Sequence, residues 1–273
     1  MPTKTLSHLT LISGENSQML RIPLKKVALL LTAIALLAAS VAHAEKAASG
    51  RVVVNVEGEL NSPSAPTDRL IPVGLLLGGS ITTTDLSVPP ELNRVIVDFN
   101  EDISLQTAGL PNCPLARLES VSAETAKREC ATAMVGHGNF SARIALPSQQ
   151  PFMLNGKLLA FNGHIGSRPA ILAQVTSERP LPLTFVIPFE IKRVRGASGT
   201  EVIGTIPPIL GNGEITAFHL SLKRFYSRAG HPASLLRAKC APFGDSFPTG
   251  NASFYFSDGT MVSITLPPCR IES

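Results

Sequence analysis

The sequence predicts an all-β protein: an antiparallel β-sandwich or barrel-like domain of about ten strands, with one short helix near residues 122–134 and an N-terminal signal helix. Three observations carry this prediction. Short apolar, β-branched runs recur at a spacing typical of sandwiches and barrels. Gly, Pro, Asn and Asp separate these runs. The composition, 44% hydrophobic and 16% charged, supplies the apolar surface that a buried core requires.

The first expected strand, at 51–57 (RVVVNVE), follows a polar lead-in at 45–50 and is β-branched and partly alternating. The later runs expected as strands are 71–84, 94–99, 144–146, 157–161, 170–176, 183–194, 201–206, 215–226, 252–256 and 261–266. Gly78-Gly79 suggests a bend or hairpin in the second strand. Pro188 removes a hydrogen-bond donor, so its strand should be at an edge or bulged. Asp258-Gly259 indicates a tight hairpin between the last two strands.

One segment of the domain favours a helix. Residues 122–134 are rich in Ala, Glu, Lys and Arg, and Ser122 is a suitable N-cap. Gly136 would end this helix, so 136–139 (GHGN) is interpreted as a turn before the next strand. Residues 234–239 fit a helical turn or a strand equally well. In 215–224, period-two alternation turns Phe218, Leu220 and Leu222 inward and His219 toward solvent.

The N-terminal 44 residues are typical of a secretory signal peptide. Arg21, Lys25 and Lys26 precede an uncharged apolar run at 27–39. Ala42-His43-Ala44 fits the small-residue cleavage pattern, which predicts cleavage after Ala44 and a single domain at 45–273. The alternative is an uncleaved membrane anchor, although the run is shorter than the roughly 20 residues of a spanning helix. Met19 is an alternative start, because the segment before it is long and polar for a signal peptide.

The cysteines agree with export. All four, Cys113, Cys130, Cys240 and Cys269, follow the predicted cleavage site, and an even number in an exported chain indicates disulfides. Three pairings are open. We favour Cys113–Cys130 and Cys240–Cys269, because each pair brackets a local segment. The spacing contains no C-x₂₋₄-C pair, so it predicts no metal ligands. The sequence therefore predicts a disulfide-stapled domain.

The charge balance argues against a nucleic-acid partner. Four of the 24 basic residues and one of the 20 acidic residues precede the cleavage site, which leaves 20 and 19 in the domain. Nucleic-acid binding requires a concentrated positive surface, and the sequence has no Lys/Arg-rich run. The expected partner is an unidentified extracellular or surface molecule. Membrane contact is expected only through an uncleaved N-terminal segment.

No motif predicts a catalytic residue, a cofactor or a metal site. The pentapeptide G-x-S-x-G is absent, and residues 196–199 (GASG) are interpreted as a turn. The domain's histidines, His137, His164, His219 and His231, form no metal-binding pair. Paired acids suit a glycosidase, and the candidates for such a pair are Asp98, Glu101, Asp102 and Glu190. These acids are better interpreted as solvated, with 98–102 forming a strand-end turn. A sugar-binding role is disfavoured because Trp is absent and only Tyr226 and Tyr255 are present.

Several short motifs together resemble a group of secreted actinobacterial proteins without an assigned function. They are Leu159-Ala160-Phe161-Asn162-Gly163, Pro188-Phe189, Gly199-Thr200, Phe218-x-Leu220-x-Leu222-x-Arg224, Cys240 and Pro267-x-Cys269-Arg270. The resemblance covers roughly residues 90–271. It implies an exported β domain with paired cysteines, and it assigns no site residue.

Three functions are consistent with the sequence. The first is a non-catalytic extracellular or cell-surface domain that binds or assembles with a partner. The second is a secreted hydrolase with an unrecognised site near 98–102 or His137, which requires acids or a His–Ser pair to converge in one cleft. The third is a binder of a small apolar ligand, which requires a sizeable interior cavity. We expect a non-enzymatic protein.

Overall fold

A computed structural model describes residues 44–61, 69–194, 198–208, 213–239 and 249–266. All described residues belong to one compact unit, Ala42–Ser273. The predicted signal helix therefore lies outside the described residues, as do Ala42, Cys240 and Cys269.

The predicted fold class is confirmed: the described chain is almost entirely β, with one short α-helix, α2 (Ala123–Glu129). Two 3₁₀ turns flank this helix, η1 (Leu115–Arg117) and η2 (Ala131–Ala133). The strands are β1 (Ala44–Ser49), β2 (Val52–Asn61), β3 (Ile71–Thr83), β4 (Leu92–Asn100), β5 (Ile103–Leu105), β6 (Met134–Ile144), β7 (Phe152–Ile165), β8 (Arg168–Ser177), β9 (Leu183–Arg193), β10 (Ser198–Thr205), β11 (Gly213–Leu222), β12 (Phe225–Arg228), β13 (His231–Ser234), β14 (Leu236–Ala238), β15 (Gly250–Phe256) and β16 (Met261–Thr265).

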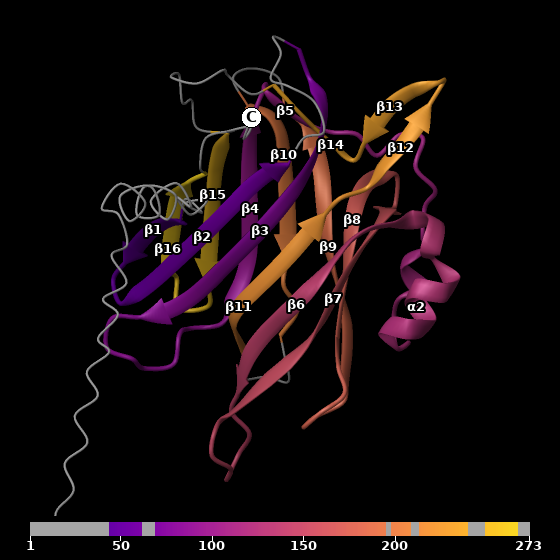
Figure 1. Ribbon diagram of the computed structural model, residues 1–273. Helices are drawn as coiled ribbons and strands as arrows, with labels where there is room; N and C mark the ends of the chain where they lie inside the picture. The colour runs from indigo at the N-terminus through magenta and orange to yellow at the C-terminus, as the bar shows by residue number, and fades with distance from the viewer. Residues whose placement is uncertain (1–43, 62–68, 195–197, 209–212, 240–248, 267–273) are drawn as a thin grey trace, which may run out of the picture. The chain divides into compact units, whose positions relative to one another are not determined.

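One large antiparallel sheet organises the fold (Figure 1). Its strand order is β1-β2-β3-β11-β6-β7-β8-β9-β10-β4-β15-β16, and β14 joins β5 to β3. The two end strands, β1 and β16, contact each other, so the sheet is nearly closed into a barrel. The hairpin of β12 and β13 forms a separate two-stranded sheet. The β15–β16 hairpin turns at Asp258-Gly259 as predicted, with Gly259 at φ 84°.

Alternating side chains place the core inside this sheet. In β2, Val54 and Val56 are buried, whereas Asn55 and Glu57 between and beyond them are partly exposed. In β11, His219 is exposed and its apolar neighbours face the interior, as the sequence predicts. Burying apolar surface at about 25 cal/mol per Å² is the main source of stability for such a sheet. The interior wall is therefore apolar on every side.

Two predicted turns are wrong because their glycines lie within continuous strands. β3 passes straight through Gly78-Gly79, and β6 passes through residues 136–139. A Cβ atom on Gly79 would lie 2.6 Å from the Phe218 ring, and one on Gly136 would collide with the backbone of Ser221. Glycine is required at these points because a neighbouring strand or ring approaches closely, and not because the chain turns.

The strand edges also differ from the expectation. The polar lead-in at 45–50 is largely part of β1, which pairs with β2 from Ala44 to Ser49.

Pro188 lies in β9, which is not an end strand of the sheet. Its pairing with β10 nevertheless stops at Phe189, so Pro188 pairs only with β8 and lies on a locally free edge. This position fits a residue without an amide hydrogen.

Helix α2 covers the outer face of β7 and β8. It begins after Ser122, whose hydroxyl accepts a hydrogen bond from the Thr125 amide at 3.2 Å, so the predicted N-cap is confirmed. Ala123 and Ala126 of the helix are buried in a cluster with Leu159, Phe161 and Leu172. The helix is shorter than predicted, because 3₁₀ turn η2 and then β6 replace its second half.

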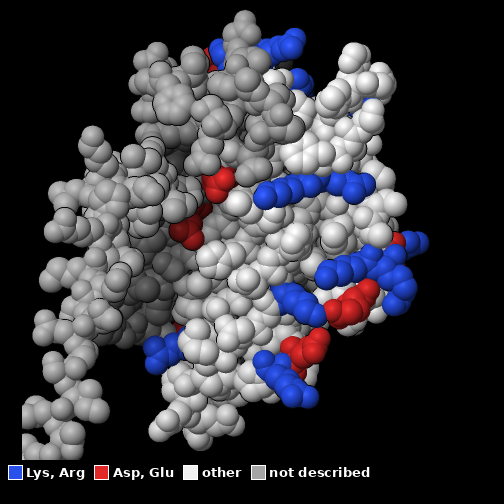
Figure 2. Space-filling view, in the orientation of Figure 1, with Lys and Arg blue, Asp and Glu red and all other residues white. Residues whose placement is uncertain are grey.

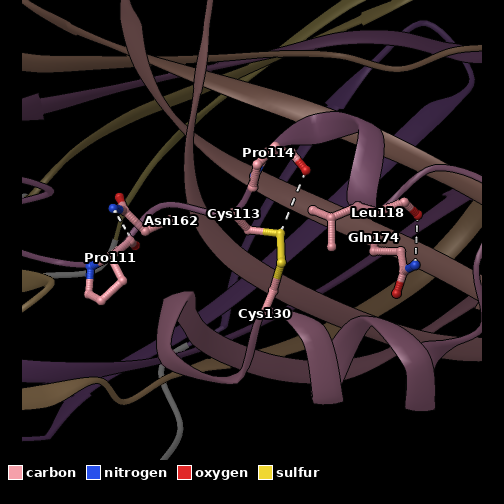
Figure 3. The surroundings of a disulfide bond; sticks show 7 residues. All are labelled: Pro111, Cys113, Pro114, Leu118, Cys130, Asn162 and Gln174. Carbon is pink, nitrogen blue, oxygen red and sulfur yellow. Dashed lines mark hydrogen bonds between the residues drawn. A yellow bond between two sulfur atoms is a disulfide. The ribbon is translucent and has the colours of Figure 1, made fainter.

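A disulfide fixes this outer layer to the segment before it (Figure 3). Cys113 and Cys130 are bonded, with their Cα atoms 5.5 Å apart, which confirms the first favoured pairing. The second, Cys240–Cys269, involves residues outside the described chain and stays a prediction. Two buried amides anchor the same layer. The Asn162 amide donates to the Pro111 carbonyl at 3.1 Å, and the Gln174 amide donates to the Leu118 carbonyl at 2.8 Å.

Candidate functional site

The candidate site is an apolar cavity of about 250 Å³ inside the barrel-like sheet. Residues from nearly every strand of the sheet line it. Among the described lining residues, only Glu59 and Thr249 have polar side chains. Alternation along β2 turns Glu59 toward the outer surface, where it is exposed. The cavity therefore presents almost no hydrogen-bonding or charged group to a molecule inside it.

Phenylalanines opposite glycines shape the wall of this cavity. Three such cross-strand pairs lie in direct register in the sheet. They are Phe140 with Gly156, Phe189 with Gly204, and Phe218 with Gly79. In each pair a Cβ atom on the glycine would collide with the partner's ring, so the ring occupies the space of the missing side chain. All three rings line the cavity.

This arrangement keeps large side chains against the wall. A phenylalanine that stood upright on an inner face would extend toward the middle of the barrel and fill it. A ring that lies over a facing glycine instead covers the sheet backbone and leaves the middle open. The pairing of phenylalanine with glycine recurs at three separate places, on β6–β7, β9–β10 and β3–β11. It is therefore a repeated feature of the cavity wall.

Two leucines from outside the cavity lining pack against residues of its wall. Leu110 and Leu235 are buried together with Ala160 and Ile171 of the wall. The segment that carries Leu110 is held by Asn162, whose amide also donates to the Asn112 side chain at 2.9 Å. The buried Asn162 therefore fixes the segment from Leu110 to Asn112 against β7.

The size of the cavity limits its occupant. It is larger than the roughly 150 Å³ apolar cavity that stays dry and binds benzene, and slightly smaller than the roughly 300–1,000 Å³ of drug-sized pockets. An apolar cavity of this size is unfavourable for water, since water requires two to four polar partners. A compact hydrocarbon-like molecule fits both its chemistry and its volume.

None of the four candidate acids lines the cavity. Asp98 on β4 lies opposite Glu201 of β10, and its partial burial and the Glu201 carboxylate together raise the pKa of Asp98. Glu190 lies on β9, with β10 between it and β4, and it pairs with Arg168 at 2.8 Å. Glu101 and Asp102 form the turn between β4 and β5, whereas Asp98, predicted to lie in the same turn, is within β4. Glu190 is engaged in an ion pair, and neither the cavity nor the groove of His137 and His219 holds it together with another of these acids.

The four histidines of the described residues are all exposed, and two of them share one groove. His137 of β6 and His219 of β11 lie on the outer face, in a groove of about 440 Å³ that Glu57, Glu59 and Ser221 also line. His219 Nδ1 lies 3.9 Å from Glu57 Oε1. Ser221 is directly opposite His137 in the strand register. His164 and His231 lie outside this groove.

Charges of both signs lie on the face of the molecule that carries α2 and β6–β7. On the face drawn in Figure 2, the Lys, Arg, Asp and Glu side chains of the described residues lie scattered among wide uncharged areas. Lys157 forms an ion pair with Glu124 at 2.6 Å, which raises the pKa of Lys157 and lowers that of Glu124. Such exposed pairs contribute little to stability.

The chain matches no protein-family model, no curated protein and no solved structure. None of the helices in the described part of the chain has the length and apolarity needed to cross a membrane. The disulfide between Cys113 and Cys130 is compatible with an extracytoplasmic protein.

The alternation at 218–222 predicts that Phe218, Leu220 and Leu222 face inward, and these residues line the cavity, but the sequence does not show that the interior is open. The only sign of the cavity in the sequence was the presence of glycines in the strands, at Gly79, Gly156 and Gly204. These glycines indicate a site only when the strand register is known, because the register places a phenylalanine opposite each of them.

Proposed function

We propose that this protein is an exported binding protein that holds a small apolar molecule inside its barrel-like sheet. The observation that carries the proposal is the cavity itself, with its apolar lining and three phenylalanine rings laid over facing glycines. Binding follows from the hydrophobic effect, because a ligand transferred into the cavity loses apolar contact with water. No covalent chemistry is required.

Export is the second part of the proposal, and it rests on the predicted signal peptide and on the disulfide. Cleavage after Ala44 would leave Glu45 to Ser49 paired with β2, so the sheet would keep nearly all of β1. We expect N-terminal sequencing of the secreted protein to begin at Glu45. Recovery of the full chain in the membrane fraction would contradict cleavage and favour the uncleaved anchor.

The other two functions draw less support from the described chain. Its large exposed apolar side chains belong to five different elements and loops, namely Leu86, Met153, Val194, Phe225 and Met261. A partner-binding surface usually gathers such residues into one patch. For a hydrolase, Ser221 lies opposite His137, but a triad requires a third group that orients the histidine, and the carboxylate of Glu57 approaches His219 instead.

The test is binding of an uncharged apolar fluorophore, N-phenyl-1-naphthylamine, to the purified protein. Its emission should rise on binding and fall again when an uncharged apolar competitor such as cyclohexane or decanol is added. Ala173 is buried and lines the cavity, so Ala173→Leu should fill part of it and weaken binding at least tenfold. Ala48→Leu, the same change at an exposed position of β1, should leave binding unchanged.

A second readout separates lost binding from lost folding. A ligand that binds only the folded state raises its stability, by about 2.7 kcal/mol at a concentration of 100 Kd. Saturating fluorophore should therefore raise the unfolding temperature of the wild type and of Ala48→Leu, but not that of folded Ala173→Leu. Equal binding by both variants would place the fluorophore outside the cavity and overturn the proposal.

A further inference from the structure

A groove on the outer face of the sheet gathers donors that bind metal ions. It crosses β2, β3, β11 and β6, and its floor contains Gly78 and Gly138. Two carboxylates, Glu57 and Glu59, line it from β2, and two imidazoles, His137 and His219, line it from β6 and β11. Imidazole and carboxylate are the common protein ligands of Zn²⁺ besides thiolate.

We propose that Glu57, His137 and His219 bind one divalent transition-metal ion, with Zn²⁺ as the ion of choice. None of these three side chains lines the apolar cavity, because alternation along each strand places them on the outer face of the wall. Zn²⁺ suits mixed nitrogen and oxygen ligands in tetrahedral geometry, with water in the remaining position.

The Glu57–His219 pair is already spaced for a shared ion. His219 Nδ1 and Glu57 Oε1 are 3.9 Å apart. Zn²⁺ lies about 2.0–2.2 Å from nitrogen and oxygen ligands, so one ion can touch both atoms when they are no more than about 4.2 Å apart. The pair therefore needs only a small closing movement to reach tetrahedral spacing.

Gly78 makes this approach of the two side chains feasible. It lies between Glu57 of β2 and His219 of β11 in the strand register. A Cβ atom on Gly78 would lie 2.5 Å from Glu57 Oε1 and 3.0 Å from His219 Nδ1. The glutamate and the histidine therefore lean toward each other over a bare backbone, and any side chain at this position would separate them.

His137 supplies the third ligand from the next strand. In the register of β6 and β11, His219 pairs with Asn139, so His137 lies on the diagonal, two residues along β6. Diagonal neighbours in an antiparallel pair are about 7–8 Å apart, within reach of two long side chains that converge on one ion. Among the described residues no three donors already surround one point, so binding requires the exposed His137 side chain to turn toward His219.

The charge around the groove favours a cation. Glu57 and Glu59 are two residues apart on β2, so both side chains lie on the same outer face. Across the sheet, His219 pairs with Asn139 of β6, and Asn139 pairs with Lys157 of β7. Lys157 forms an ion pair with Glu124 at 2.6 Å. The Glu124 carboxylate therefore offsets much of the positive charge of Lys157, which weakens the repulsion between Lys157 and a cation in the groove.

The test is titration of untagged, metal-free protein with Zn²⁺ by isothermal calorimetry, with Co²⁺ absorption as a probe of coordination. We expect one Zn²⁺ per chain and Co²⁺ bands typical of tetrahedral nitrogen and oxygen ligands. Outer-shell partners of metal ligands are worth about 10–100-fold in affinity, so loss of a ligand in Glu57→Gln, His137→Gln or His219→Gln should weaken binding at least tenfold. His164→Gln, which removes an exposed histidine outside the groove, should bind as the wild type does.

Gly78→Ala is the geometric variant, because it keeps all donors and forces Glu57 and His219 apart. It should also weaken Zn²⁺ binding, while circular dichroism reports whether each variant stays folded. The proposal is overturned by a wild type that binds no Zn²⁺ or by equal weakening in His164→Gln. A folded His137→Gln variant with unchanged affinity would likewise overturn the three-ligand site.

Discussion

The ring of Phe218 covers the backbone of Gly79 on the adjacent strand, in the space where a side chain at position 79 would otherwise stand. Both residues lie in long strands of the same wall, and Phe218 lines the cavity. The pair links a local feature of the sequence, glycine within a strand, to the open interior of the barrel. Substitutions at these two positions can therefore test how the pair shapes the cavity.

Gly79→Ala should shrink the cavity and destabilise the fold. The new Cβ atom would lie 2.6 Å from the Phe218 ring, so the ring must swing into the cavity. Overpacking of this kind usually costs about 1–3 kcal/mol. Urea unfolding of the variant and the wild type measures this loss in the free energy of unfolding. N-phenyl-1-naphthylamine should bind more weakly to the variant than to the wild type.

The double variant Gly79→Ala/Phe218→Leu is the control for this prediction. The smaller leucine leaves room for the alanine, so the double variant should recover part of the stability and of the fluorophore binding. Residues in contact deviate from additivity by about 0.5–3 kcal/mol. Additive effects of the two changes would show that the ring and the glycine do not act as a pair.

Removal of the Cys113–Cys130 disulfide should destabilise the domain without changing its fold. The two cysteines are 17 residues apart, and a closed loop of about this length contributes about 3 kcal/mol in the chain-entropy model. Cys113→Ala/Cys130→Ala should therefore unfold at a lower urea concentration. Reduction of the wild type is not an equivalent test, because reductant also acts on any bond between Cys240 and Cys269. A loss below about 1 kcal/mol would mean that packing, and not the bond, holds α2 in place.

The fold class was predictable because side-chain alternation is a local property. The run from Phe218 to Leu222 shows on its own which residues face inward, and the structure places them there. The Asp258-Gly259 hairpin and the Ser122 cap are also local, since each depends on residues no more than three positions apart. Features of this range can be inferred from one sequence.

The cavity and the groove were not predictable, because both depend on strand register. Gly78, Gly79 and Gly136 resemble turn residues until the neighbouring strand is known to approach them. Glu57 and His219 are 162 positions apart, and they meet only because β3 lies between β2 and β11. β1 was missed for a similar reason: its sequence is polar, and its pairing with β2 makes it a strand.

The buried amide of Gln174 should be important for the outer layer. It donates to the Leu118 carbonyl at 2.8 Å and to the Val121 carbonyl at 3.1 Å, and its residue is 0% exposed. Gln174→Met keeps the volume but leaves both carbonyls without this donor, which should cost about 2–4 kcal/mol in urea unfolding. A loss within about 0.5 kcal/mol of zero, the usual range for surface changes, would contradict this role.

Gln174→Glu separates hydrogen bonding from packing at the same position. At pH 7 its buried carboxylate would face two carbonyl oxygens, so it should be less stable than Gln174→Met. Burial raises the pKa of such a carboxyl group above that of the unfolded chain. Protonation therefore favours the folded state, and this variant alone should gain stability, relative to Gln174→Met, as the pH falls from 7 toward 4.

The turn after β3 should give the protein a measurable response to acid. The Asp85 carboxylate accepts hydrogen bonds from the Ser87 hydroxyl at 2.6 Å and from the Ser87 amide at 3.1 Å. These bonds lower the pKa of Asp85 from its ordinary 3.8 to about 2. Because the folded-state pKa lies below the unfolded one, the carboxylate stabilises the fold above about pH 4, and this contribution is lost as the pH falls toward 2. Asp85→Asn removes the titrating group, so the wild type should be the more stable protein at pH 5 and should lose this advantage between pH 4 and pH 2. Urea unfolding of both proteins at each pH measures the difference, and a constant offset over the whole range would show that the Ser87 bonds do not depend on the charge.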